Sequence, residues 1–191
     1  MKTHKKRKNS GIKWMTMLLL FAGFGFNSAL AQGQFYRTAT GRLIIKADLN
    51  DVSVTIESKD LLIQLDYETG NVVIRQEISA MKADNDSIQS MIKNNENGFL
   101  KFIGKLGLDY VNTTDHAPLD FGVEGTLFPQ NIHVIGTGHL EHIAQRTTSA
   151  CLLSLEFILE SGVLFPENQI PGLHKNIHIK VIQSLLATGG E

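Results

Sequence analysis

The stretch VEGTLFPQNIHVIGTGHLEH, residues 123–142, permits three interpretations, and the choice among them decides the fold. The GTG segment beside a histidine has the look of a phosphate-binding loop. The segment HLEH offers two histidines and a carboxylate that are close enough in sequence to form part of a metal site. Alternatively, the whole stretch is two β-strands joined by a turn at FPQN.

The phosphate-loop interpretation fails on the residues after the two glycines. In the motif G-x-G-x-x-G, the third glycine lets a helix begin close to the pyrophosphate. Here that position is Glu141, whose negative charge repels phosphate, and no helix start follows it. Nucleotide binding at this stretch is therefore excluded.

The metal-site interpretation depends on which faces the histidines occupy. Successive side chains of a strand point to opposite faces, so His139 and Glu141 share one face and His142 lies on the other. His133 shares the face of His139 but stands six residues away, roughly 20 Å along an extended chain. Neither H-E-x-x-H nor H-x-x-E-H is present. We expect outward polar positions here, with no metal and no cofactor.

The remaining interpretation is a hairpin with a type I turn at residues 128–131, where Pro129 suits the second position. The same period-2 alternation of apolar and polar residues recurs along the chain. It predicts nine strand-like segments, and a turn between the third and fourth in which Gly70 takes a positive φ. The segments are RLIIKADL (42–49), VSVTI (52–56), LLIQLDY (61–67), NVVIRQEI (71–78), FLKFIGKLGLDYV (99–111), FGVEGTLF (121–128), IHVIGTGHLEHI (132–143), ACLLSLEFILE (150–160) and NIHIKVIQSLL (176–186).

One segment departs from this alternation. ADNDSIQSMIKNN offers Asp84, Asn85 or Asp86 as an N-cap, followed by Ile88, Met91 and Ile92 at helical spacing, which predicts a short helix over about 86–93. Many antiparallel strands with one covering helix indicate a barrel or a sandwich. Glycines inside the strand-like runs favour the barrel, because closure needs bends and bulges. They are Gly104, Gly107, Gly125, Gly136 and Gly138.

The N-terminal segment predicts export. A basic region ends at Lys13, residues 14–26 are an uncharged and mostly apolar run, and Ser28-Ala29-Leu30-Ala31 places small residues before a cut at Gln32. We interpret residues 1–31 as a signal peptide and residues 32–191 as a single domain, found in the periplasm or secreted. The alternative is an uncleaved membrane anchor. No cysteine lies near the cut, which excludes acylation as a lipoprotein.

Charge and cysteine usage limit the function further. Residues 1–31 hold six of the 18 Lys and Arg and none of the 19 Asp and Glu, so the remaining chain has a net charge of −7 (12 − 19). Such an acidic protein lacks the basic surface that nucleic acid binding needs. The single cysteine, Cys151, stands in an apolar run and is predicted to be buried rather than nucleophilic. We find no catalytic constellation, since Glu156 and Glu160 share an outward face, and we expect no enzyme activity; a hydrolase is a third possibility for which the sequence offers no residues.

The order of these segments resembles the YceI-like family of secreted and periplasmic proteins. The resemblance spans about residues 42–186 and implies a lipocalin-like antiparallel barrel, whose lumen holds a polyisoprenoid or another lipid. The landmarks that carry it are LDYETGNVVIRQEISAMKADNDSIQSMIKN (65–94), GFLKFIGKLGLDYV (98–111), FGVEGTLFPQNIHVIGTGHL (121–140) and SACLLSLEFIL (149–159).

The inward faces of the expected strands fit such a lumen, because an acyl or isoprenoid chain needs an apolar channel with few polar groups. The same residues also fit a barrel whose interior is simply filled by side chains, acting as a structural or protein-interaction module of the cell envelope. The sequence leaves both possibilities open. The candidate ligand-binding residues are Phe102, Leu106, Leu108, Tyr110, Val123, Leu127, Leu155, Phe157, Ile179 and Val181.

Overall fold

The computed structural model describes residues 35–95, 98–109, 117–144, 149–164 and 170–188. All of these belong to one compact unit, residues 33–191. The predicted signal peptide, residues 1–31, lies outside the described residues, so its assignment stays a prediction.

Strands dominate this part of the chain, and all nine predicted strand segments are present. Short helical elements separate some of them: a 3₁₀ turn at Ile78–Ala80 (η1) and two α-helices, Asp86–Asn94 (α2) and Ser161–Leu164 (α3). The strands are Phe35–Leu49 (β1), Val52–Ser58 (β2), Leu62–Asp66 (β3), Asn71–Glu77 (β4), Lys82–Ala83 (β5), Phe99–Leu106 (β6), Leu119–Phe128 (β7), Ile132–Ala144 (β8), Ser149–Glu160 (β9) and Asn176–Thr188 (β10).

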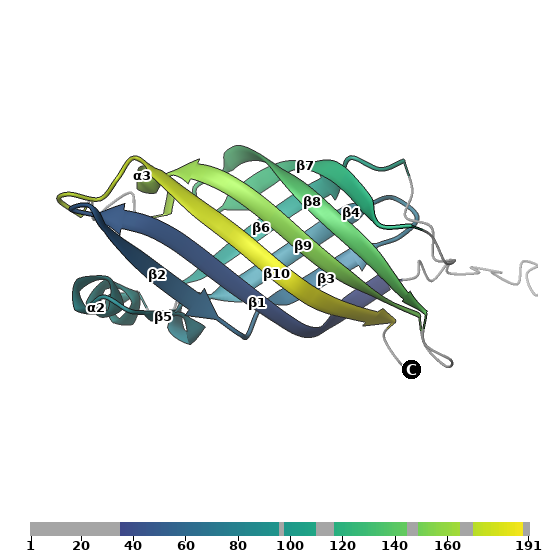
Figure 1. The fold of residues 1–191 in the computed structure, drawn as a ribbon, viewed down its shortest axis with the longest axis horizontal. Coiled ribbons are helices and arrows are strands. Elements are labelled where there is room, and N and C mark those ends of the chain that lie inside the picture. The colour runs from purple at the N-terminus through teal and green to yellow at the C-terminus, as the bar shows by residue number, and fades with distance from the viewer. Residues whose placement is uncertain (1–34, 96–97, 110–116, 145–148, 165–169, 189–191) are drawn as a thin grey trace, which may run out of the picture. The chain divides into compact units, whose positions relative to one another are not determined.

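The strands form a closed antiparallel barrel (Figure 1). Around the wall, the sequence of neighbours is β1, β3, β4, β6, β7, β8, β9 and β10, and β10 pairs again with β1. Closure gives every wall strand two partners and removes the exposed sheet edges that an open sheet would leave. The expectation of a barrel rather than a sandwich is therefore confirmed.

Strand β1 is long enough to pair with two strands along one of its edges. Its start pairs with β3 (Arg37 opposite Gln64) and its end pairs with β2 (Leu43 opposite Ser58) in one unbroken register. β2 and β3 are thus one strand with a break at residues 59–61. β1 and β2 are joined by Asn50 and Asp51, whose φ angles of 50° and 62° are those of a type I′ hairpin turn.

The break lets the wall change partners near one rim of the barrel. β4 pairs with β3, whereas the short strand β5 pairs with β2, and α2 connects β5 to β6. Asn85 caps α2 by accepting hydrogen bonds from the backbone N–H groups of Ser87 and Ile88. Ile88 and Ile92 are buried against the barrel core, which confirms the predicted helix and its apolar face.

Two turns and one strand bear on the sequence predictions. Gly70 has a φ of 69°, as its position in the β3–β4 turn required. β7 and β8 are neighbours joined by a short turn, as the hairpin interpretation predicted; in this turn the Phe128–Pro129 peptide bond is cis and Asn131 has a φ of 57°. The strand predicted over residues 99–111 was too long, because β6 ends at Leu106 and a bend at residues 107–109 follows. A glycine at 107 allows the chain to turn away there.

Candidate ligand cavity

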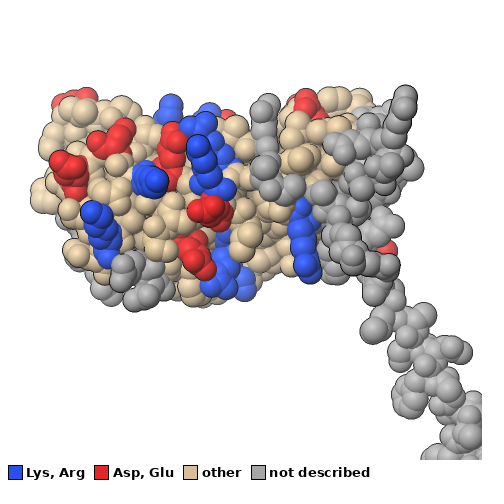
Figure 2. All heavy atoms as spheres, turned by 90° about the horizontal axis from the view of Figure 1, so that it is seen from below, with Lys and Arg blue, Asp and Glu red and all other residues tan. Residues whose placement is uncertain are grey.

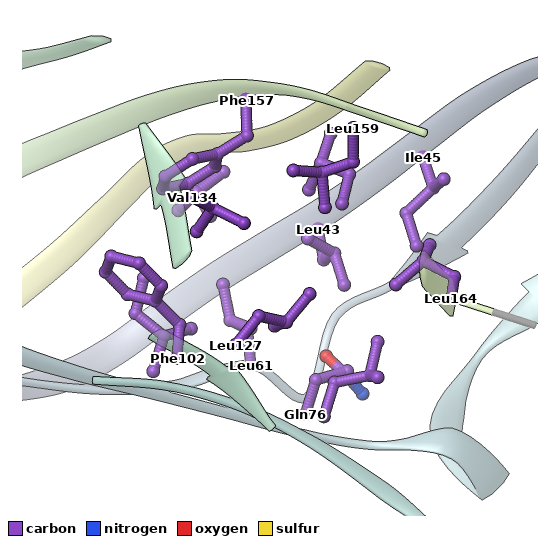
Figure 3. A pocket seen from close by; sticks show the side chains of 14 residues that line it. Leu43, Ile45, Leu61, Gln76, Phe102, Leu127, Val134, Phe157, Leu159 and Leu164 are labelled. Atoms are coloured by element: carbon purple, nitrogen blue, oxygen red, sulfur yellow. The ribbon is translucent and has the colours of Figure 1, made fainter. Parts of the chain in front are cut away.

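The barrel interior contains an apolar cavity of about 60 Å³ (Figure 3). Thirteen of its lining residues are aliphatic or aromatic, and one, Gln76, is polar. The lining comes from seven strands, the β2–β3 break and α3. It consists of Leu43, Ile45, Leu61, Ile74, Gln76, Leu100, Phe102, Leu127, Val134, Phe157, Leu159, Leu164, Ile179 and Val181.

These residues all lie toward one rim of the barrel. They come from the last residues of β1, β4, β7 and β9 and from the first residues of β6, β8 and β10. In an antiparallel barrel, the ends of alternate strands and the starts of the strands between them meet at the same rim. Leu164 of α3 places that helix at this rim as well. We call this half of the barrel, defined by the lining residues, the cavity half.

Two phenylalanine rings bound the cavity on its inner side. Phe102 on β6 and Phe157 on β9 approach across the interior with ring centroids 5.2 Å apart and planes inclined by 56°. Inward glycines make room for the rings. A Cβ on Gly104 would lie 2.4 Å from the Phe102 ring, and a Cβ on Gly136 would lie 2.6 Å from the Phe157 ring. The strand glycines thus accommodate aromatic side chains.

Beyond this pair, the interior is filled. We call this region the packed half, and its side chains show almost no solvent exposure: Leu65, Val72, Leu106, Leu140, Cys151, Leu153, Leu155 and Leu186 are between 0% and 1% exposed. The Tyr67 hydroxyl donates a hydrogen bond to the Cys151 sulfur at 3.0 Å. Burial raises the pKa of the Cys151 thiol to about 11, which makes it unreactive at neutral pH.

The candidate ligand-binding residues divide between the two halves. Five of the ten line the cavity, namely Phe102, Leu127, Phe157, Ile179 and Val181. Leu106, Val123 and Leu155 are buried inside the barrel but belong to the packed half, away from the cavity. Leu108 lies in the bend after β6 and is half-buried, and Tyr110 lies outside the described residues. The assignment of all ten residues as ligand-binding residues stays a prediction.

Nine of the fourteen lining residues were not among the candidates, and one of these nine, Gln76, is polar. The sequence pattern could have identified it. Val72, Ile74 and Gln76 follow the period-2 alternation of β4, and Gln76 is the polar residue on this apolar inward face. Gln76 is only 2% exposed. A polar side chain that gives up water inside an apolar interior costs free energy unless it finds a partner, so its presence calls for a reason.

The cavity is small in comparison with typical ligand sites. Pockets that bind small molecules commonly have volumes of about 300–1,000 Å³. A cavity of about 60 Å³ falls well below that range. A long apolar ligand therefore needs the lining side chains to move apart, and Leu164 on the short helix α3 and the Phe102–Phe157 pair bound the space that would widen.

The outer surface of the barrel carries paired charges. Arg42 contacts Glu57 at 2.8 Å across β1 and β2, and Lys180 contacts Glu156 at 2.6 Å across β10 and β9. Figure 2 shows basic and acidic side chains intermingled on the face that it presents. Among the described residues, no group of three or more His, Cys, Asp or Glu side chains is placed to hold a metal ion.

The histidine of the GTGH segment lies on this outer surface. The Nδ1 atom of His139 lies 2.6 Å from Oδ1 of Asp120 on the neighbouring strand, and Nε2 lies 3.5 Å from Oε1 of Glu141. The hydrogen bond to Asp120 raises the pKa of His139 above its usual value, and Glu141 adds to the effect. The prediction that His139 and Glu141 share an outward face is confirmed.

The barrel is similar to two solved structures. One is a polyisoprenoid binding domain from Saccharophagus degradans implicated in plant cell wall breakdown, with a TM-score of 0.57 and 8% identity over 81% of this chain and 98% of that domain. The other is BcnA from Burkholderia cenocepacia, with a TM-score of 0.52 and 8% identity over 78% of this chain and 96% of that chain. At this identity, the likeness establishes the fold alone.

Sequence comparison, unlike comparison of folds, finds no match. No family model matches the chain, and no curated protein matches it. Within the described residues, no helix has the length and apolar character needed to cross a membrane.

Proposed function

We propose that this protein is a non-enzymatic, YceI-like barrel that binds an apolar lipid of the polyisoprenoid type in its cavity half. The observation that carries the proposal is the apolar cavity itself, which lies inside a closed barrel and has thirteen apolar residues among fourteen. Such a lining suits a hydrocarbon chain, because removing apolar surface from water is the main source of affinity for such ligands. The likeness in fold to a polyisoprenoid binding domain supports the same assignment.

The proposal includes export and the absence of a nucleic acid partner. Support for export comes from the basic region, the apolar run and the small residues before Gln32. Support against nucleic acid comes from the net charge of −7 expected after cleavage (12 − 19) and from the pairing of surface lysines and arginines with carboxylates. The proposed ligand is delivered and held, without chemical change.

A second candidate is a filled β-domain that acts as a structural or protein-interaction module of the cell envelope. Two observations favour it: the small cavity volume, and several large apolar side chains exposed on the outer surface. Val52, Leu62, Ile135 and Ile158 are each between 60% and 67% exposed. Burying such side chains against a partner protein removes apolar surface from water and lowers the free energy.

The two candidates differ in what the protein carries when it is purified. We would express the full-length chain in its own host, isolate the exported form under gentle conditions, and record its native mass spectrum and analyse its organic extract. A lipid-carrying barrel gives an additional mass that the extract identifies as an isoprenoid or a similar apolar compound. A mass equal to the polypeptide alone, together with an extract free of lipid, overturns the proposal and supports the interaction module.

A further inference from the structure

Among the described residues that line the cavity, Gln76 is the one with a polar side chain, and the structure orients its amide. The Nε2 atom donates a hydrogen bond to the backbone carbonyl of Glu77 at 2.8 Å. This bond needs an N–H donor, so it assigns the nitrogen to that side of the amide and leaves the oxygen on the other. Figure 3 shows the oxygen directed toward the interior, with Leu43 and Leu127 beyond it.

The Gln76 oxygen has no hydrogen-bond partner among the described residues, although it is fully buried. An unsatisfied buried acceptor loses the hydrogen bonds that it made with water in the unfolded chain and gains none in return. A water molecule is a poor remedy at this place, because an ordered buried water needs about two to four polar partners. The described part of the cavity lining supplies this amide as its one polar side chain.

We propose that the Gln76 oxygen accepts a hydrogen bond from the ligand, and that the ligand is a neutral apolar chain bearing an O–H or N–H donor, for which a hydroxyl group is the probe. The donor follows from the chemistry of the site, since a carbonyl oxygen pairs only with O–H or N–H. The neutrality follows from the lining, which includes no charged side chain among the described residues. A phosphate or carboxylate at this depth would have no countercharge, and burying an unpaired charge is far more costly than burying a hydroxyl.

This inference rests on the proposed function, and three probes of one carbon skeleton separate them. Geraniol carries a hydroxyl donor, geranyl methyl ether carries only an acceptor, and geranyl phosphate carries a charge. We would measure the binding of each to the exported protein, freed of lipid, by isothermal titration calorimetry. We expect geraniol to bind about tenfold more tightly than the ether, as one satisfied buried hydrogen bond allows, and the phosphate to bind most weakly.

The substitution Gln76→Met tests the residue, because methionine keeps the length of the side chain and removes the acceptor. We expect the variant to lose the preference of geraniol over the ether. Gln64→Met is the matched control: Gln64 lies on β3 with its side chain exposed, and the same substitution there should keep the preference. Chemical denaturation of both variants shows that the comparison is made on folded protein.

The outcomes distinguish the two proposals. If the ether and geraniol bind equally well to the wild-type protein, or if Gln76→Met weakens both alike, the role of Gln76 is overturned while lipid binding stands. Tighter binding of geranyl phosphate than of geraniol overturns the neutral ligand. If none of the three probes binds to the wild-type protein, the proposed function falls and the inference falls with it.

Discussion

The two halves of the barrel are built from the same strands but are packed differently. In the packed half, a row of aliphatic side chains and Cys151 fill the interior to full burial. In the cavity half, side chains of similar size leave a space, and Leu61 at the break after β2 and Leu164 of α3 contribute to its lining. The difference teaches that composition alone does not decide whether a barrel is filled, because the same aliphatic residues line both halves.

The largest difference between the halves should come from removing side-chain volume on one strand. Leu155 and Leu159 both point inward from β9, and the first is 0% exposed in the packed half while the second is 8% exposed at the cavity. We expect Leu155→Ala to cost about 4 kcal/mol, near the upper end for such truncations, and Leu159→Ala about 2 kcal/mol, because Leu159 has fewer neighbours to lose. Urea denaturation measures both. Equal costs would show that the halves do not differ in packing.

Adding volume sharpens the same comparison on β6. Leu106→Trp should overpack the packed half and cost about 1–3 kcal/mol, whereas Leu100→Trp enters the cavity and should cost less than about 1 kcal/mol. The chain has a single tryptophan, Trp14, inside the predicted signal peptide, so each variant of the exported form gains its own fluorescence signal for following unfolding. A larger cost at residue 100 than at 106 would contradict the assignment of the cavity to this rim.

The packed half can also be probed without changing its sequence, through Cys151. Burial raises the thiol pKa to about 11 from 9.0, so the folded protein keeps the thiol protonated after the unfolded chain has begun to ionise. A group whose pKa is raised on folding stabilises below its unfolded pKa, and stability should therefore fall as the pH rises from 9 toward 11. Thiol reagents at pH 8 should label Cys151 only on unfolding. Rapid labelling of the native protein would mean that this half opens readily.

The smallest effect is expected on the outer surface. Asp120 raises the pKa of His139, so the charged histidine stabilises the fold below pH 6.5, and this contribution disappears as the pH rises through the raised pKa. Both side chains are exposed, and we expect the overall stability to change little. Nuclear magnetic resonance titration should show a lower His139 pKa in Asp120→Asn, and a smaller decrease in Glu141→Gln. An unchanged His139 pKa in Asp120→Asn would show that this ion pair does not form in solution.

The sequence predicted the wall better than the interior. Alternation located all nine strand segments, because a strand that separates an apolar interior from water must alternate. The cap at Asn85 located α2 for an equally local reason. The end of β6 at Leu106 was missed, since alternation continues through Leu108 and Tyr110 although Gly107 allows the chain to bend.

The position of the cavity could not be predicted from the sequence, for a different reason. Positions 100 and 106 are both leucine and lie on the same face of β6, yet Leu100 lines the cavity and Leu106 belongs to the packed half. What distinguishes them is which residues of other strands and of α3 lie opposite each, and this depends on contacts between segments far apart in sequence. The glycines were interpreted as aids to closure, but Gly104 and Gly136 also receive phenylalanine rings. Five of the candidates do line the cavity, and Gln76, a polar residue in an apolar alternation, was a further local sign that was not used.

The central claim is that the cavity half binds an apolar ligand, and calorimetric titration of geraniol into the wild-type protein and Leu100→Trp tests it most directly. The tryptophan occupies the cavity while leaving the packed half unchanged. The account predicts that the wild-type protein binds geraniol and that the folded variant binds it at least about tenfold more weakly. Equal binding by the two proteins would place the ligand elsewhere, and no binding by the wild-type protein would leave a barrel that is filled for structural reasons alone.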